Sequence, residues 1–264
     1  MDDNLAPIPW EELDDGHMQL SEKVAMHLRE QIVSGQLKEG DFLRIESIAK
    51  ALGVSPTPVR EGLLLLKSEA LVRLMPRRGF RVCSFSKQDL LDLFWAQATI
   101  GAELAARAAT QMPTEQMNQL DALQVEYEIA IRNNDEKQIA RLGHQFHRTI
   151  NLASDSQRLA YLLGSLTRQL PNRFYASIEG HLSTTVQYHP IILGAIKLRD
   201  PVAASSLMFR HINEGGQLLV EMLEKRGLWA EEKLAAAAPA IRGRRSSSAT
   251  KQAKPGVVKL KRAV

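Results

Sequence analysis

A short segment beginning at Ser55 combines hydroxyl, proline and arginine side chains in a spacing that suits contact with nucleic acid. The segment reads SPTPVRE: Ser55 is a good helix N-cap, and both prolines fall in the first helical turn, where no hydrogen bond is lost. Ser55 and Thr57 supply hydroxyl groups, and the Arg60 guanidinium can form a bidentate contact with guanine or phosphate. The alternative role for Arg60 is an ion pair with a neighbouring acid. In the first turns of a helix, these three side chains would suit entry into a DNA major groove.

Two adjacent arginines, Arg77 and Arg78, lie in a connector between two strand-like stretches at 71–75 and 79–82. The connector is Pro-Arg-Arg-Gly, and Gly79 permits a tight turn. The expected structure is a hairpin with a basic tip. Taken alone, the pair would be a solvated loop, but a hairpin that follows DNA-reading helices is a wing. Its arginines are then predicted to reach the minor groove or the phosphate backbone.

Three helices are predicted to precede this hairpin. Residues 19–34 carry an apolar stripe of Val24, Leu28 and Ile32 at helical spacing, and Gly35 follows. A shorter helix at 45–52 ends at Gly53, and the next runs from 55 to about 69. Two short helices joined by a glycine-containing turn are the helix-turn-helix arrangement. With the hairpin, residues 17–82 are predicted to form a winged helix-turn-helix domain.

From Ser86 onward the sequence predicts helices only. Ser86 and Asp89 resemble a capping box at the start of the first of them, with Asp in place of the usual Glu or Gln. Proline, asparagine and aspartate separate successive apolar stripes, as expected for a helical bundle. The predicted helices are 86–111, 114–133, 135–153, 156–170, 184–198 and 201–226. The expected fold class is mainly α, an N-terminal winged helix-turn-helix followed by a C-terminal all-α helical bundle.

The charges are distributed unevenly along the 264 residues, although the formal net charge is only +4. Residues 1–16 carry six acids and no bases and are expected to be an acidic leader. Residues 17–82 carry eleven bases and seven acids, which suggests an anionic partner for this block. Residues 83–239 are nearly neutral, and it is the family resemblance described below that implies an effector-binding and dimerisation domain for them. Residues 240–264 carry eight bases and no acids and are predicted to be a disordered basic tail. This tail is either an extension without a role or an arm that adds phosphate contacts.

Composition excludes several other classes of protein. The only cysteine, Cys83, excludes an internal disulfide framework and a CxxC redox or zinc motif. No run approaches the roughly 18 apolar residues that a membrane span needs. The first residues are acidic and lack the layout of a signal peptide. The sequence therefore predicts a cytoplasmic protein with no membrane partner.

Four stretches resemble the N-terminal domain of GntR-type bacterial transcription regulators: IVSGQLKEGDFL, IAKALGVSPTPVREGL, LLLKSEALV and PRRGFRV. The match is nearly gapless over about residues 20–82, and the helical remainder is similar to the FCD (FadR-like) subgroup. The resemblance implies a homodimer that binds a palindromic site on double-stranded DNA and responds to a small-molecule effector. The family usually has Arg where this chain has Pro56, so the operator sequence or the affinity is expected to differ. The implied DNA-binding residues are Ser55, Thr57, Arg60, Arg77 and Arg78.

The same resemblance assigns a metal site to three histidines of the helical half. His147 lies in GHQFHRTI, similar to the family's DxxFHxxI; His189 lies in YHPIILGAI, similar to HxxILxAI; and His211 lies in MFRHI. In such proteins three imidazoles and an aspartate converge inside the bundle, and the metal can hold a carboxylate effector. Imidazole nitrogens suit zinc, nickel or related divalent ions. The resemblance therefore implies zinc or nickel at His147, His189 and His211; the alternative is an effector pocket that holds no metal.

Four positions bear on that site. Gly143 stands where the family has its aspartate ligand, and His144 is the candidate substitute, because it lies near the same helical face as His147. Thr99 stands where the family often carries Arg, and it is the candidate effector-binding residue outside the histidines. A loss of both an anion and a cation would keep the local charge balanced while shifting the effector toward a less acidic compound. Pro190 predicts that the helix containing His189 starts or kinks there.

Two other functions fit part of the sequence. A metalloenzyme could use three histidines and a bound water, but no HExxH, nucleophile motif or glycine-rich phosphate loop accompanies them. A sequence-blind architectural DNA binder would use the basic tail but would leave the large helical half without a role. The preferred prediction is a regulator that is not an enzyme.

Overall fold

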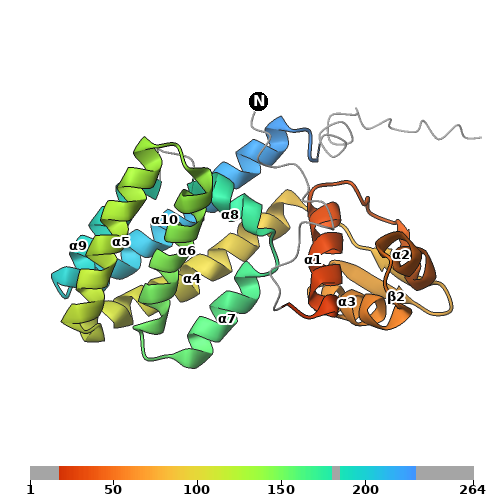
Figure 1. The fold of residues 1–264 in the computed structure, drawn as a ribbon, viewed down its shortest axis with the longest axis horizontal. Coiled ribbons are helices and arrows are strands. Elements are labelled where there is room, and N and C mark those ends of the chain that lie inside the picture. Colours follow the sequence, from red (N-terminus) through yellow and green to blue (C-terminus); the bar gives the residue numbers. More distant parts are fainter. Residues whose placement is uncertain (1–17, 180–184, 230–264) are drawn as a thin grey trace, which may run out of the picture. The chain divides into compact units, whose positions relative to one another are not determined.

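The computed structural model describes residues 18–179 and 185–229 (Figure 1). A winged helix-turn-helix occupies the N-terminal part, as predicted. Its helices are α1 (Leu20–Val33), α2 (Ile45–Leu52) and α3 (Pro56–Ser68). Its strands are β1 (Phe42–Leu43), β2 (Val72–Met75) and β3 (Gly79–Val82). Buried apolar side chains of α1 and α3, among them Val24, Leu28 and Leu63, form the centre of this part.

The wing is an antiparallel hairpin of β2 and β3, in register from Val72 opposite Val82 to Met75 opposite Gly79. Its tip uses left-handed backbone at Arg77 (φ 63°) and Gly79 (φ 88°). A φ of this sign costs glycine nothing and costs an L-residue such as arginine roughly 1–2 kcal/mol. The predicted basic hairpin tip is therefore present.

Strand β1 was not predicted from the sequence. It has two residues, which pair antiparallel with β3: Phe42 opposite Arg81 and Leu43 opposite Phe80. The three-stranded sheet has the order β1-β3-β2. Two residues are too few to show the alternation of apolar and polar side chains that predicts a strand. Strand β1 therefore forms only through its pairing with β3 of the wing.

The C-terminal part is all helical, as predicted, and Figure 1 shows its helices gathered into one bundle. The Ser86–Asp89 capping box is formed: Asp89 N donates to Ser86 Oγ at 3.1 Å, and Ser86 N donates to Asp89 Oδ2 at 2.7 Å. The helix that it starts packs against the last one over much of their lengths. The helices are α4 (Lys87–Gln111), α5 (Thr114–Arg132), α6 (Glu136–Leu152), α7 (Gln157–Thr167), α8 (Asn172–Glu179), α9 (Thr185–Lys197) and α10 (Pro201–Lys225).

Three details differ from the sequence-based expectation. Helix α8 was missed, because Phe174 and Ile178 are its only strong apolar pair and their burial needs partners from elsewhere in the fold. Helix α7 ends at Thr167 rather than near residue 170, where the approach to Pro171 disfavours helical backbone. Helix α9 is described from Thr185 and continues through Pro190, so it does not start at that proline.

The acidic leader assigned to 1–16 and the basic tail assigned to 240–264 lie outside the described residues. Within the described ranges, no helix combines the length and apolar character needed to cross a membrane.

Close helix packing in the bundle gives a first prediction. A Cβ added at Gly216 of α10 would lie 2.6 Å from the Cβ of Phe94 on α4, whereas one added at Gly194 of α9 would meet nothing within 4 Å. We expect Gly216→Ala to lower the free energy of unfolding by about 1–2 kcal/mol, since overpacking exceeds the gain in helix propensity. The matched change Gly194→Ala should raise it by roughly 0.5–1 kcal/mol. Urea denaturation of both variants measures the two values, and equal shifts would contradict the packing argument.

Candidate functional site

The start of α3 presents the side chains that the sequence assigned to DNA. Ser55 is the N-cap residue with extended backbone (φ −72°, ψ 161°), but its side chain makes no capping hydrogen bond. Ser55, Thr57 and Arg60 are all exposed, while Pro58 and Val59 between them are buried. The helix therefore turns its hydroxyls and its guanidinium outward and anchors itself through the residues between. A free helix N-terminus also attracts phosphate.

Arg60 is not committed to a neighbouring acid. Within residues 18–179 and 185–229, no carboxylate forms an ion pair with it. The alternative role considered for Arg60 therefore lacks support. Pro56 occupies the first helical position, so the side chain that the family usually places there is replaced by a ring without a donor.

Basic side chains on two other elements extend this exposed surface. Arg77 and Arg78 at the wing tip are exposed, as a DNA-contacting wing requires. Sequence reasoning missed Arg44, an exposed arginine at the N-cap position of α2. Its signal was available, because a base immediately before the first helix of a helix-turn-helix lies close to the DNA backbone.

The three histidines of the helical half meet, although they come from three different helices. His147 lies on α6, His189 on α9 and His211 on α10. Their ring centroids are 5.2, 5.0 and 5.1 Å apart, which is a nearly equilateral triangle. One nitrogen from each ring lies within 4.8 Å of the other two, and the Nε2 atoms of His147 and His211 are 3.1 Å apart. We call these three residues the histidine cluster.

Burial keeps the inner members of the cluster neutral. The side chains of His189 and His211 are almost fully buried, whereas His147 is half-buried. Burial lowers the pKa of His189 well below 6.5, and the nearby His211 and His147 lower it further. The pKa of His211 is also far below its ordinary value, through burial and then His147. Neutral imidazole is the form that binds metal.

Aromatic rings surround the cluster and restrict its geometry. Phe146 stacks on His189 at 4.2 Å with an interplanar angle of 17°, and Tyr127 lies 5.2 Å from the same imidazole. Tyr188 lies 5.4 Å from His211, and its hydroxyl donates to Glu214 Oε2 at 2.8 Å. Burial, followed by the bond to Glu214, raises the pKa of Tyr188. The imidazoles are thus held by packing against rings rather than by solvent-exposed contacts.

The cluster offers the donor type of a divalent-metal site, and one of its nitrogen pairs has a matching distance. Two imidazole nitrogens bound to zinc at about 2.0–2.1 Å, with an angle of about 90–110°, lie roughly 2.9–3.4 Å apart. The 3.1 Å between His147 and His211 falls inside this range. In addition, His211 Nδ1 is buried without a hydrogen-bond partner among the described protein atoms. Three imidazoles leave at least one coordination position open to another ligand.

The structure does not bring the other candidates into the cluster. His144 is exposed, whereas His147 is half-buried. Residues three apart on a helix point about 60° away from each other, and on α6 this difference turns His144 toward solvent. It is not among the residues whose ligand atoms converge, so its proposed role as a fourth ligand is not supported. Gly143 is buried and offers no side chain. Thr99 is exposed and donates its hydroxyl to the carbonyl of Trp95 on its own helix, which does not support an effector-binding role.

Sequence reasoning also missed the polar side chains beside the cluster. Tyr188 precedes His189 directly, and Glu214 follows His211 by one helical turn. Arg210 lies 3.6 Å from Glu214 and 5.9 Å from the Tyr188 ring centre. Their nearness in sequence to two of the histidines was the available signal, but only the fold shows that α9 and α10 join them.

Comparison with known proteins agrees with both parts of this description. Residues 20–82 match bacterial regulatory proteins of the gntR family, and residues 92–214 match the FCD domain. The HTH-type transcriptional regulator YdhC of Bacillus subtilis strain 168 is 25% identical over 201 residues, 75% of this chain and 90% of YdhC. The HTH-type transcriptional repressor RspR of Escherichia coli K12 is 24% identical over 216 residues, 81% of this chain and 94% of RspR.

A solved structure supports the fold. The structure of E. coli McbR/YncC covers 80% of this chain and 99% of its own, with a TM-score of 0.56 and 22% identity. Each of the two family matches covers the part of the chain where the structure places the corresponding domain. The exposed recognition helix and wing, joined to a helical bundle with these matches, identify the chain as a member of the GntR family of bacterial regulatory proteins, a DNA-binding transcription regulator with an FCD domain.

Proposed function

We propose that the protein is a homodimeric regulator whose affinity for a palindromic operator is set by a small carboxylate effector, bound at a divalent metal in the FCD domain. Ser55, Thr57 and Arg60 read bases in the major groove, and the wing arginines contact the minor groove or the backbone. His147, His189 and His211 bind zinc or nickel. The observation that carries the proposal is the convergence of three imidazoles inside the domain that follows the exposed recognition helix.

The chemistry of the cluster favours an anionic effector. Three neutral imidazoles add no charge, and Gly143 stands where the family has an aspartate, so a divalent ion would keep a local charge of +2. Burying such a charge without an anion is costly. A carboxylate from solution would supply both the missing charge and the missing oxygen ligand. This compensation supports a carboxylate over the less acidic effector considered from sequence.

The dimer follows from the requirements of DNA reading. One chain presents one recognition helix, which contacts only a few base pairs. Two copies related by a two-fold axis would present two such helices to half-sites about one helical turn apart, so the preferred site would be palindromic. An effector then changes affinity by binding unequally to the DNA-competent and the incompetent arrangement of the two helices.

The experiment begins with protein purified without a histidine tag. Metal content is measured directly and after incubation with zinc or nickel, and a preferred duplex is selected from a random pool at several salt concentrations. We expect about one metal per chain, and one palindromic sequence bound more tightly than the pool average by about a thousandfold or more at physiological salt. Sedimentation of the complex should give two chains per duplex.

Other outcomes would favour the competing functions. Equal, salt-sensitive affinity for every duplex would indicate a sequence-blind architectural binder. Turnover of simple esters or amides by the metal-loaded protein, abolished by removal of the metal, would indicate a metalloenzyme. Absence of metal after incubation with both ions would overturn the metal site and leave only the DNA-binding half of the proposal.

A further inference from the structure

A buried ion pair connects the FCD domain to the first helix of the DNA-binding domain. Arg173 Nε on α8 lies 2.5 Å from Glu30 Oε1 on α1, and the two side chains are only 5% and 3% exposed. Burial lowers the pKa of Arg173, and the negative charge of Glu30 opposes that effect. The guanidinium also lies over the Phe174 ring, 4.7 Å from its centre. Because both charges are buried, separating Arg173 from Glu30 would carry a large penalty.

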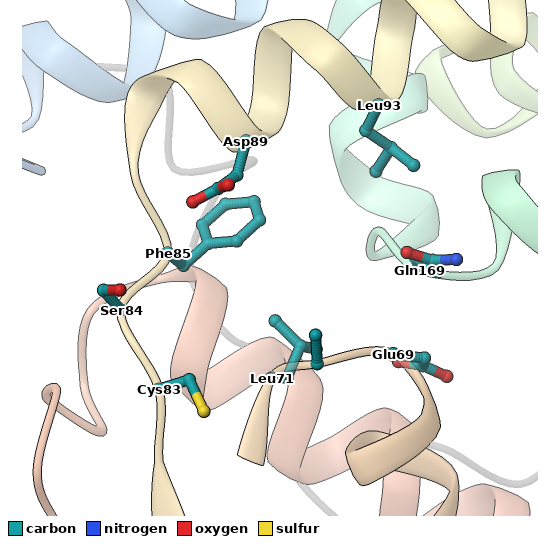
Figure 2. A pocket seen from close by; sticks show the side chains of 9 residues that line it. Glu69, Leu71, Cys83, Ser84, Phe85, Asp89, Leu93 and Gln169 are labelled. Carbon is teal, nitrogen blue, oxygen red and sulfur yellow. The ribbon is translucent and has the colours of Figure 1, made fainter. Parts of the chain in front are cut away.

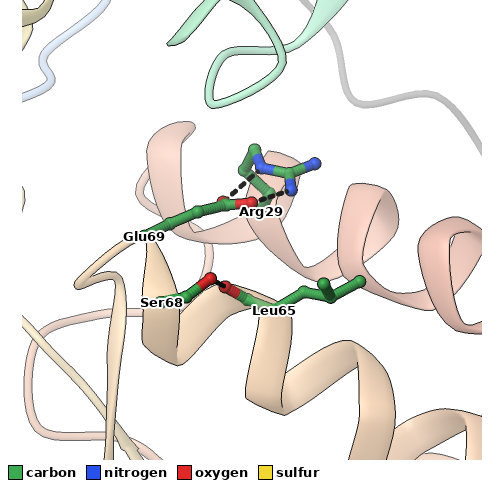
Figure 3. A network of polar contacts seen from close by, with 4 residues as sticks. All are labelled: Arg29, Leu65, Ser68 and Glu69. Carbon is green, nitrogen blue, oxygen red and sulfur yellow. Dashed lines mark hydrogen bonds and ion pairs between the residues drawn. The ribbon is translucent and has the colours of Figure 1, made fainter. Parts of the chain in front are cut away.

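Helix α1 is in turn firmly attached to the recognition helix. Arg29, next to Glu30, forms a bidentate pair with Glu69 at the end of α3: Nε to Oε2 at 2.8 Å and Nη2 to Oε1 at 2.5 Å (Figure 3). Nearer the start of α3, a Cβ at Gly62 would lie 2.8 Å from the carbonyl of Ser21, so the two backbones are in close contact. A displacement of α1 must therefore carry α3 with it.

The other end of the connection reaches the helices of the histidine cluster. Helix α8 packs against α6, which carries His147, and against α10, which carries His211. A Cβ at Gly215, one turn beyond His211, would lie 3.1 Å from Cγ2 of Ile178 on α8. On α8, Tyr175 donates its hydroxyl to Gln97 of α4 at 3.2 Å. The element with Arg173 at its start thus contacts three helices of the bundle.

The region beside this connection is not filled. A cavity of about 400 Å³ lies between the end of α3 and the start of α4, and Figure 2 shows Glu69 and Leu71 on one side of it and Asp89 and Leu93 on the other. Glu69 both lines this cavity and pairs with Arg29. This space leaves room beside the end of α3. On the other side of α1, the ion pair to Arg173 fixes Glu30 against α8.

We propose that α8 couples the histidine cluster to the recognition helix, and that the Arg173–Glu30 ion pair is the contact through which it positions α1 and α3. The inference rests on the proposed function, since it names how occupancy of the cluster is transmitted to DNA. Arg173 and Glu30 are positioning residues in this scheme and touch neither metal nor DNA.

Two double variants and a control separate transmission from folding. Glu30→Leu with Arg173→Met removes both charges and keeps apolar volume, a change that buried ion pairs often tolerate. Glu30→Arg with Arg173→Glu restores a pair of reversed polarity. The control, Asp121→Asn with Lys197→Met, removes an exposed ion pair of 2.6 Å between α5 and α9. Zinc alone is the probe, and metal content is measured for each protein.

Two readouts are taken with and without zinc: affinity for the selected duplex, and amide hydrogen exchange of α1 in the absence of DNA. In wild type and the control we expect zinc to change the affinity by about fivefold or more and to change exchange in α1. The apolar pair, Glu30→Leu with Arg173→Met, should bind as much zinc as the wild type. Zinc should change its affinity for the duplex by less than about twofold and should leave hydrogen exchange in α1 unchanged. The reversed pair should recover the wild-type response.

The failures are distinguishable. A full zinc response in the apolar pair would overturn the coupling role of Arg173 and Glu30 while leaving the proposed function intact. A wild type that binds zinc but shows neither response would overturn this inference, that occupancy of the histidine cluster reaches α1, while the effector-dependent function proposed above would stand. Should the reversed pair not fold, the apolar pair and the control still decide between these outcomes.

Discussion

Replacement of Arg60 by alanine is expected to abolish sequence-specific binding of the selected duplex. A bidentate contact between arginine and guanine contributes about 1–3 kcal/mol, and two recognition helices in a dimer would lose roughly twice that. Arg60 is exposed in the second turn of α3, and no carboxylate of the described residues pairs with it, so its guanidinium is available for a base. Fluorescence anisotropy with the selected and with a scrambled duplex measures the change in both affinities.

The matched control for this variant is Lys67→Ala. Lys67 is exposed in the last turn of the same helix, seven residues and about 10 Å further along its axis, and its removal deletes the same charge. We expect Lys67→Ala to retain the preference for the selected sequence, with at most a uniform loss of affinity. If Arg60→Ala weakened binding to the scrambled duplex as much as to the selected one, Arg60 would be a phosphate contact and not a base-reading residue.

A chain carrying His189→Ala is expected to retain no metal and to lose all stabilisation by zinc. At a zinc concentration 100 times the dissociation constant, binding to the folded state adds about 2.7 kcal/mol to the free energy of unfolding. In a protein of this size that corresponds to a rise in Tm of about 5–11 °C. His189 is the most buried of the three imidazoles, and Phe146 stacks on it. Among the described residues, only His147 and His211 join it in offering a ligand atom to the cluster.

His144→Ala is the control, because His144 is an exposed imidazole one turn from His147 on the same helix. It should bind zinc and gain stability as the wild type does. The quantity compared is the rise in Tm caused by zinc, since the loss of a buried ring at position 189 also lowers Tm without metal. An unchanged rise in His189→Ala, or a lost one in His144→Ala, would mean that the metal lies elsewhere.

The parts of the fold that were predicted correctly depend on local chemistry. The Ser86–Asp89 capping box, the proline-rich start of α3 and the hairpin tip at Arg77–Gly79 each involve residues at most four positions apart. Hydrogen bonds and backbone preferences at that range are decided before the chain folds, so they can be read from sequence. The apolar stripes of the long helices are of the same kind.

The missed elements depend on partners far along the chain. Strand β1 exists because Phe42 and Leu43 pair with β3 about forty residues later. Helix α8 is short, and Phe174 and Ile178 become buried only against side chains of other helices. The sequence likewise did not fix where His144 and Thr99 lie relative to the cluster, since helical spacing gives an angle around an axis but not which side the bundle covers.

The sequence by itself determined the class of this protein: a winged helix-turn-helix with outward donors on one helix, followed by a helical bundle with histidines at family-like positions. Only the tertiary structure decided that His144 lies outside the cluster, that the cluster contains no carboxylate of the described residues, and that Glu30 and Arg173 face each other in a buried site. The physical reason is distance along the chain. Local hydrogen bonds and helical periodicity follow from neighbouring residues. The histidine cluster and the buried ion pair instead join residues from 22 positions apart (His189 and His211) to about 140 positions apart (Glu30 and Arg173), and these meet only when their helices pack in one specific arrangement.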